Sequence, residues 1–198
     1  RELMSADIAV METVFVESGA DLSDGVFARD VIVKPAISAG SNNTARYKND
    51  VAGATEHARK LLNSGIAVLA QPYQSAIDEY GETGLVYLGG QFSHGFRKAP
   101  IFADNDQNHN GLYVVEEITL RIPSAAERAF GDTVVAFVKN KFGVSPLYAR
   151  VDMVVNAAGV PELMELELTE PSLFLHLDDE SPARASLAFA NAASTNER

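Results

Sequence analysis

Carboxylates and an arginine are concentrated in two short apolar stretches towards the C-terminal end of the chain. Arg150 and Asp152 lie two positions apart in the first stretch, and Glu165 and Glu167 lie two positions apart in the second. Each stretch is typical of a strand, and side chains two positions apart on a strand share one face. The turn at 156–159 allows the two strands to pair as a hairpin. Three carboxylates and an arginine then converge on one side of a sheet.

This arrangement predicts a site for a metal ion and a phosphate. Three clustered carboxylates raise one another's pKa values unless a cation lies among them. Hard oxygen ligands favour Mg²⁺, which usually shares its coordination shell with waters and phosphates. The adjacent Arg150 indicates that the anion is a phosphate, and the metal ligands are then Asp152, Glu165 and Glu167. The alternative is the solvated face of a surface hairpin in an acidic protein, and the hairpin alone does not decide between the two.

A second candidate phosphate site follows a short apolar run at 30–35, which is typical of a buried strand. Lys34 stands at the end of this run and supplies a positive charge. The loop that follows offers backbone N–H groups and hydroxyls to a phosphate from Ser38, Gly40, Ser41 and Thr44. The sequence has no Walker A motif. The alternative is a strand end followed by an ordinary surface loop.

The expected strand at 66–71 ends in Gln71, Pro72 and Tyr73. Proline cannot donate a hydrogen bond to a neighbouring strand, so pairing stops there. The backbone groups that become free in such a hinge can bond the edge of an adenine. The alternative is a plain connection between two lobes.

The densest basic patch is the strand-like stretch 91–98, which ends in Arg97 and Lys98. These two side chains fall on opposite faces, so at most one of them points the same way as Phe92 and His94. The alternative is a pair of solvated charges on an edge strand. His94 could act as a general base, but a single histidine is more often structural.

Composition limits the classes of function. The chain has 198 residues, 46% of them hydrophobic, which is enough for one sizeable domain or two small lobes. It has no apolar run long enough to span a membrane and no signal peptide, and it begins without Met, as a fragment or a processed form does. The absence of cysteine excludes disulfides and zinc–thiolate sites and is compatible with a cytoplasmic protein. A net charge of −11 argues against general affinity for nucleic acid or anionic membranes.

Strands and helices mix without strict βαβ alternation, which predicts an α+β fold with a largely antiparallel sheet. Strands are expected at 8–16, 30–35, 44–48 and 66–71, and hairpins at 84–98 and 148–171. Helices are expected from Asp50 to about 62, from a capping box at Ser124 and Glu127 to about 141, and from 181 onward. The side chains expected to face the core are Ala126, Phe130, Val134, Phe137 and Val138 on the second helix and Val151, Met153, Met164, Leu166 and Leu168 on the last hairpin.

Other catalytic constellations find little support in the sequence. There is no G-x-S-x-G elbow for a serine hydrolase and no H-E-x-x-H for zinc. Glu165 and Asp152 could form a glycosidase pair, but tryptophan is absent and aromatic residues are few. His57, His109 and His176 have no visible partners and receive no role.

Taken in order, these motifs resemble the ATP-grasp superfamily, and within it the prokaryotic glutathione synthetase-like branch with its group of O-ureidoserine cyclo-ligases and carboxylate–amine ligases. The matching segments are 31–35 with the loop after it, 70–73, 77–82, 93–100, 150–152 and 164–167. Together they extend over residues 8–190. Three departures stand out: the family's preceding lobe is not part of these residues, its second nucleotide lysine usually precedes the position of Arg1, and the branch often has Ser where Gly84 stands.

The resemblance implies an ATP-grasp fold of two α+β subdomains that clasp ATP, with residues 1–70 carrying the phosphate-binding lysine and flap, and residues 71–198 carrying the adenine hinge, the magnesium-binding hairpin and the C-terminal helix. The cofactors it implies are ATP and Mg²⁺. It implies nucleotide binding by Lys34, Ser38, Ala39, Gly40, Gln71, Pro72, Tyr73, Glu79 and Glu82, metal binding by Asp152, Glu165 and Glu167, and catalytic roles for Arg150 and for Arg97 or Lys98.

The implied reaction is ATP-dependent ligation, in which a carboxylate attacks the γ-phosphate and the resulting acyl-phosphate is captured by an amine or a similar nucleophile. The partners are then small molecules, without nucleic acid or membrane, and a homo-oligomer is left open. Two alternatives remain at this point: a catalytically silent ATP- or ADP-binding fragment, and kinase-like transfer to a small molecule.

Overall fold

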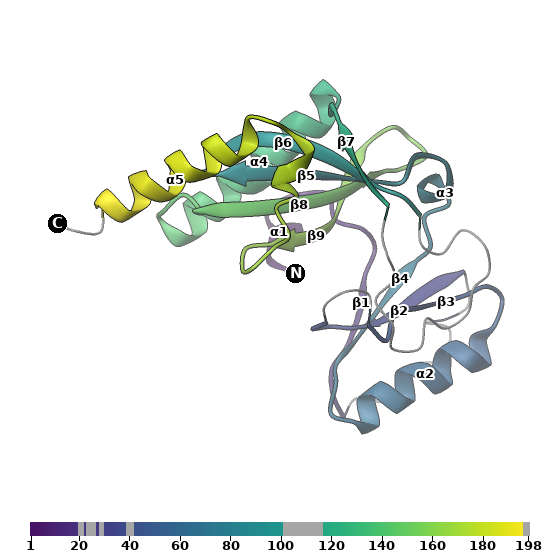
Figure 1. Cartoon of the computed structure of the whole chain (residues 1–198). Helices are drawn as coiled ribbons and strands as arrows, with labels where there is room; N and C mark the ends of the chain where they lie inside the picture. The colour runs from purple at the N-terminus through teal and green to yellow at the C-terminus, as the bar shows by residue number, and fades with distance from the viewer. Residues whose placement is uncertain (20–21, 23–26, 28–29, 39–41, 101–116, 196–198) are drawn as a thin grey trace. The chain divides into compact units, whose positions relative to one another are not determined.

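The computed structural model describes residues 1–19, 22, 27, 30–38, 42–100 and 117–195 (Figure 1). The chain divides into two compact units, each with its own sheet. The four-stranded unit comprises residues 11–78 and 100–116, and the five-stranded unit comprises residues 1–10, 79–99 and 117–198. The expected functional division near Gln71 stays a prediction. None of the helices in the described part of the chain has the length and apolar character that crossing a membrane requires.

The sheet of the four-stranded unit is antiparallel throughout and has the strand order β1-β4-β2-β3. Its elements are β1 (Val14–Val16), β2 (Val31–Pro35), β3 (Ala45–Tyr47), α2 (Val51–Asn63) and β4 (Val68–Pro72). The short helix α3 (Ala76–Tyr80) follows and joins this unit to the next.

Helix α2 covers the sheet of this unit. Asp50 caps its first turn, since one carboxylate oxygen accepts a hydrogen bond from the Gly53 N–H at 2.9 Å. Ala54, Ala58 and Leu61 recur at helical spacing and are buried in the same cluster as the strands. The predicted cap and helix are therefore confirmed.

The expected strand at 8–16 is only partly present. Val14–Val16 pairs with β4, whereas Val10 bridges Leu163 of the other sheet. The Leu163 N–H donates to the Ala9 carbonyl at 2.9 Å. The stretch is divided because its two ends hydrogen-bond to different sheets, which an apolar run in a sequence does not reveal.

The sheet of the five-stranded unit has the order β7-β6-β5-β8-β9, and every neighbouring pair is antiparallel. Its elements are α1 (Glu2–Ser5), β5 (Glu82–Leu88), β6 (Gln91–Lys98), β7 (Ile118–Arg121), α4 (Ala125–Phe142), β8 (Tyr148–Val155), β9 (Pro161–Glu167), the 3₁₀ helix η1 (Leu175–Leu177) and α5 (Ser181–Thr195). The two sheets confirm the expected α+β fold with largely antiparallel strands.

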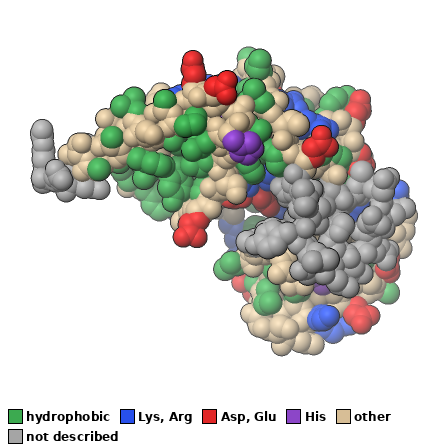
Figure 2. Space-filling model, in the orientation of Figure 1, with side chains coloured by type: hydrophobic (Ala, Val, Ile, Leu, Met, Phe, Trp, Pro, Cys, Tyr) green, Lys and Arg blue, Asp and Glu red, His purple; other side chains and the backbone are tan. Residues whose placement is uncertain are grey.

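Helices α4 and α5 lie on opposite faces of the five-stranded sheet (Figure 1). Val134 of α4 is buried with Leu85 and its neighbours, and Ala185 of α5 is buried with Val86. Leu85 and Val86 are adjacent on β5 and therefore point to opposite faces. Each helix thus closes one apolar layer. Hydrophobic side chains also gather on the outer surface along α5 (Figure 2), where Leu187 is 63% exposed.

The capping box that opens α4 is present, and it also ties the helix to the sheet. Glu127 is fully buried. Its carboxylate accepts hydrogen bonds from the Ser124 N–H at 2.7 Å and from the Thr83 hydroxyl at 2.7 Å. Burial alone would raise the pKa of Glu127, but these donors, with Arg121 at 3.1 Å, lower it. The prediction that Ala126 belongs to the core face of α4 is wrong, because Ala126 is exposed.

A β-bulge in each of two hairpins changes which side chains share a face of the sheet. In the β5–β6 hairpin the register changes at Ser93, so Phe92 packs in the α4 layer while His94 faces the other side. In the β8–β9 hairpin the register changes beside Asp152, and Leu163 rather than Met164 is buried in the core. Strict alternation fails at both places because a bulge adds one residue to a single strand.

Candidate metal and phosphate site

The β8–β9 hairpin brings the three predicted carboxylates together. Asp152 lies opposite Glu165, and Arg150 lies opposite Glu167. One oxygen from each of Asp152, Glu165 and Glu167 falls within 4.8 Å of the others. Asp152 is fully buried, and the two glutamates are half-buried. The turn is fixed by Asn156, whose side-chain oxygen accepts from the Ala158 and Val160 N–H groups.

Arg150 neutralises two of these carboxylates. Its Nε donates to Asp152 Oδ1 at 3.0 Å and its Nη2 to Asp152 Oδ2 at 2.8 Å, while Nη2 also contacts Glu167. Nη1 donates to the Ser172 carbonyl at 3.3 Å. Burial opposes the charged guanidinium, but the pKa of Arg150 is raised because Asp152 and Glu167 outweigh that effect.

Two aromatic rings lie beside the Arg150 guanidinium. Its central carbon is 5.9 Å from the ring centre of Phe96 and 5.8 Å from that of Phe174, and the two rings meet edge to face. Gly84 makes room for Phe96, since a Cβ at position 84 would lie 2.1 Å from a Phe96 ring atom. This aromatic pair was not predictable from the sequence, because Phe174 belongs to an irregular segment just before η1.

Lys98 joins the carboxylates from β6. Its Nζ lies 2.6 Å from Asp152 Oδ2 and 3.7 Å from Glu82 Oε2, and the residue is only 6% exposed. Burial opposes the charged ammonium, but the carboxylates of Asp152 and Glu82 outweigh it and raise the pKa of Lys98. The alternative of a solvated charge on an edge strand is wrong for Lys98, which is buried on a strand with neighbours on both sides, β7 and β5.

Arg97, the other candidate of this pair, points to the opposite face. Its Nε donates to the Tyr80 carbonyl at 2.7 Å, which ties β6 to the end of α3. The structure therefore brings Lys98, and not Arg97, into the carboxylate cluster.

The ligand set of the cluster suits a divalent cation. Asp152, Glu165 and Glu167 each offer a carboxylate oxygen within 4.8 Å of the others, and Arg150 and Lys98 contact Asp152. Burial raises the pKa of Glu167, and the charges of Asp152 and Glu165 raise it further, against the opposing effect of Arg150. A hard cation such as Mg²⁺ relieves this repulsion among carboxylate oxygens. The residues present therefore fit the expected metal.

The candidate phosphate residues lie in the four-stranded unit. Lys34 is half-buried on β2 and pairs with Leu69 of β4. Ser38 is exposed, and its hydroxyl donates to the Asn42 carbonyl at 3.0 Å. Ala39 and Gly40 lie outside the described residues.

The expected adenine hinge is the end of β4. Gln71 is buried, and its side-chain amide donates to the Thr13 hydroxyl at 2.9 Å, so the fold already uses this side chain. Pro72 is the last residue of the strand, and the Tyr73 N–H donates to the Asp30 carbonyl at 2.9 Å. The Arg46 guanidinium lies 3.4 Å from the centre of the Tyr73 ring.

The remaining candidates fall into two groups. Glu79 is exposed on α3, whereas Glu82 begins β5 beside Lys98.

His94 is buried, with Nε2 2.9 Å from the Leu173 carbonyl and Nδ1 3.0 Å from the Ser93 hydroxyl. Burial lowers the pKa of His94, and its contact with the Leu173 carbonyl ties β6 to the segment before η1.

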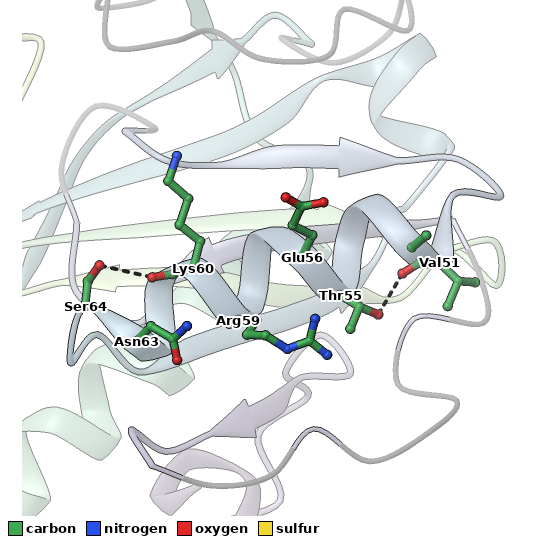
Figure 3. Close-up of a pocket in the computed structure, with 8 residues that line it drawn as sticks. Val51, Thr55, Glu56, Arg59, Lys60, Asn63 and Ser64 are labelled. Atoms are coloured by element: carbon green, nitrogen blue, oxygen red, sulfur yellow. Dashed lines mark hydrogen bonds between the residues drawn. The ribbon is translucent and has the colours of Figure 1, made fainter.

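A groove on the surface of the four-stranded unit contains none of the predicted site residues (Figure 3). It is lined by residues of α2 and its C-terminal cap: Val51, Ala52, Thr55, Glu56, Arg59, Lys60, Asn63 and Ser64. The hydroxyls of Thr55 and Ser64 donate to the backbone carbonyls of Val51 and Lys60. The groove is open, lies along one helix, and adds nothing to the candidate site.

No protein-family model matches the chain. The chain is 30% identical to the cycloserine biosynthesis protein DcsG of Streptomyces lavendulae, over 96% of its own length and 66% of that protein. The crystal structure of D-cycloserine synthetase DcsG superposes with a TM-score of 0.88 at 29% identity, over 96% of this chain and 67% of that one. The chain thus spans about two thirds of the length of these relatives.

A more distant likeness is shared with D-alanine–D-alanine ligases. The Bacillus anthracis enzyme, solved with ATP, has a TM-score of 0.65 at 16% identity, over 95% of this chain and 60% of that one. At this identity the likeness concerns the fold alone. The relationship with DcsG, the two antiparallel sheets and the carboxylate hairpin all agree with the resemblance found in the motifs. The chain therefore belongs to the ATP-grasp superfamily.

Proposed function

We propose that the chain carries the nucleotide-binding and catalytic part of an ATP-dependent ligase that joins a carboxylate to an amine or a related nucleophile. The observation that carries the proposal is the cluster of Asp152, Glu165 and Glu167 around Arg150 and Lys98. It is supported by the similarity to DcsG, which is described as a D-cycloserine synthetase, and by the fold shared with a ligase solved with ATP.

The proposed roles follow from charge and position. Asp152, Glu165 and Glu167 would hold Mg²⁺, which when bound supplies positive charge against phosphate oxygens. Arg150 and Lys98 supply fixed cationic groups on the same face. In the four-stranded unit, Lys34 and the loop at Ser38 would contact the phosphates of the nucleotide. Residues 71–73 would contact its adenine.

The proposed reaction has two steps. An oxygen of the carboxylate substrate attacks the γ-phosphorus of ATP, the bond to the β-phosphate oxygen breaks, and ADP leaves. The amine then attacks the acyl carbon of the acyl-phosphate, and inorganic phosphate leaves as the C–N bond forms. Such phosphoryl transfer depends mainly on positioning and on neutralisation of charge, which buried cations beside carboxylates provide. A cytoplasmic location and small-molecule partners remain part of this proposal.

The second candidate is an ATP- or ADP-binding chain without turnover of its own. The specific observation in its favour is that the chain spans about two thirds of the relatives it matches. Under this alternative the nucleotide binds, but no acyl-phosphate forms.

The experiment that separates the two follows ADP release with Mg²⁺-ATP and a panel of amino acids in the presence of hydroxylamine. Hydroxylamine captures an acyl-phosphate as a hydroxamate, whereas the stable phosphate ester of a kinase-like reaction yields none. The proposal predicts hydroxamate in step with ADP for at least one amino acid, and none in the Glu165→Gln variant. Nucleotide binding without ADP release across the panel would favour the silent alternative.

A further inference from the structure

Asp152 is engaged by cationic donors on both of its oxygens. Oδ2 accepts from Lys98 Nζ at 2.6 Å and from Arg150 Nη2 at 2.8 Å, and Oδ1 accepts from Arg150 Nε at 3.0 Å. Each carboxylate oxygen offers about two lone-pair directions. Oδ2 of this buried carboxylate is therefore already occupied by donors from two cationic side chains.

The two cations differ in how firmly they are held. Arg150 is anchored by Glu167, by the Ser172 carbonyl and by the rings of Phe96 and Phe174. The described contacts of the Lys98 ammonium are Asp152 and, farther away, Glu82. A lysine ammonium is a point charge on a flexible four-carbon stem, whereas the planar arginine fork is fixed by several bonds. Lys98 is therefore the cation that can leave.

A divalent cation among Asp152, Glu165 and Glu167 would lie close to the Lys98 ammonium. Like charges at such a distance repel strongly in a poorly solvated site. The two cations also draw on the same oxygens, because Lys98 holds Asp152 Oδ2. Metal binding and the Lys98–Asp152 contact thus compete.

We propose that Lys98 is the resident counter-ion of Asp152 in the metal-free chain, and that binding of a divalent cation releases the Lys98 ammonium from Asp152. The inference rests on the proposed function, because it assumes that the carboxylate cluster binds the metal. Its consequence is an order of events: Lys98 becomes available to an anionic group of the substrate only after the metal has arrived. Without the metal the carboxylate cluster stays partly neutralised by the protein itself.

The first test uses the wild-type chain and Mg²⁺ alone. Lysines are acetylated briefly with an amine-reactive reagent, with and without Mg²⁺ at the concentration that saturates a calorimetric titration, and are quantified by mass spectrometry. Lys98 labelling is expected to rise at least fivefold with Mg²⁺, whereas the exposed Lys139 on α4 stays constant as the internal control. Magnesium binding without a change at Lys98 would overturn the inference while leaving the metal site intact.

The second test uses Lys98→Met, which keeps the apolar stem, beside Lys139→Met, which removes the same charge at an exposed position. Lys98→Met should bind Mg²⁺ at least tenfold more tightly than wild type, and Lys139→Met as wild type does. Lys98→Met should also melt at a lower temperature than wild type without metal, and at the same temperature in saturating Mg²⁺. Equal affinities, or a melting difference that persists in Mg²⁺, would contradict the release.

The two proposals fail in different ways. If the wild-type chain binds neither Mg²⁺ nor Mg²⁺-ADP by calorimetry, the metal site itself is wrong and both proposals fall. If Lys98→Met does not fold, the labelling of wild type still decides the release of Lys98.

Discussion

The ammonium of Lys98 lies 2.6 Å from Asp152 Oδ2, although the two residues stand on strands β6 and β8 with β5 between them. The contact crosses β5, whose Glu82 Oε2 lies 3.7 Å from the same ammonium. A buried ion pair therefore links three strands at the candidate site. Its loss should affect both stability and ligand binding.

Lys98→Ala should mainly lower the stability of the fold, whereas Lys34→Ala should mainly weaken nucleotide binding. Removing one partner of a buried ion pair costs roughly 3–5 kcal/mol, and Arg150 still pairs with Asp152, so we expect about 3 kcal/mol for Lys98→Ala. Lys34 is half-buried, and Lys34→Ala should weaken Mg²⁺-nucleotide binding with less loss of stability. Urea unfolding beside calorimetric titration of both variants checks this. Equal destabilisation by the two substitutions would show that the Lys98–Asp152 pair contributes little.

Gly84→Ala should destabilise the chain by about 1–3 kcal/mol, the usual effect of overpacking. The added methyl would lie 2.1 Å from the Phe96 ring, which packs against Phe174 beside Arg150. The double variant Gly84→Ala/Phe96→Leu should recover part of that loss, because the smaller side chain makes room. Thermal melts of the single and double variants measure the coupling. Strict additivity would mean that Phe96 is not the residue that Gly84 accommodates.

Stability should fall in acid through Glu127. Burial opposes its ionised form, but Thr83, Ser124 and Arg121 lower the pKa of Glu127 below its ordinary value of 4.5. A carboxyl group whose folded-state pKa is lowered stabilises the fold above 4.5, and this contribution is lost as the pH falls through the folded-state pKa. Glu127→Gln should therefore be less stable than wild type at pH 7, with a difference that shrinks below pH 4.5. If the difference in stability between Glu127→Gln and wild type does not change with pH, the loss comes from packing alone.

Mg²⁺-nucleotide should stabilise the whole chain. A ligand that binds only the folded state, at about a hundredfold over its dissociation constant, adds roughly 2.7 kcal/mol. Melting curves with Mg²⁺-ADP, and with nucleotide and excess chelator as the control, test this expectation. A melting temperature that millimolar Mg²⁺-nucleotide leaves unchanged would count against the proposed ligase.

Local signals predicted the elements well. The Asp50 cap and the capping box at Ser124 each depend on a few neighbouring residues, and the hairpin at 84–98 turns at Gly89 and Gly90, where both φ angles are positive. The carboxylate cluster was predictable for a similar reason, since it needs only alternation and one tight turn.

Features that depend on distant pairing were not predictable in this way. Leu163 replaces Met164 in the core because of a bulge, and a bulge is set by cross-strand contacts that the sequence of one strand does not show. The sequence left open whether Lys98 lies on an exposed edge strand; it is buried, and the later strand β7 at 118–121 borders β6. The aromatic contact of Phe174 with Arg150 comes from an irregular segment without periodicity.

The measurement that tests the central claim most directly is calorimetric titration of Glu165→Gln and Glu167→Gln with Mg²⁺-ADP, beside wild type and Glu162→Gln. Glu162 lies on the same strand, outside the carboxylate cluster, and contacts Asn156, so its variant removes the same charge from β9. We expect wild type and Glu162→Gln to bind alike, and the two cluster variants to bind at least tenfold more weakly (about 1.4 kcal/mol). Their metal-free melting temperatures should be no lower than that of wild type, because each substitution relieves repulsion among carboxylates. Unchanged affinity in both cluster variants would contradict the metal site, and with it the proposed ligase.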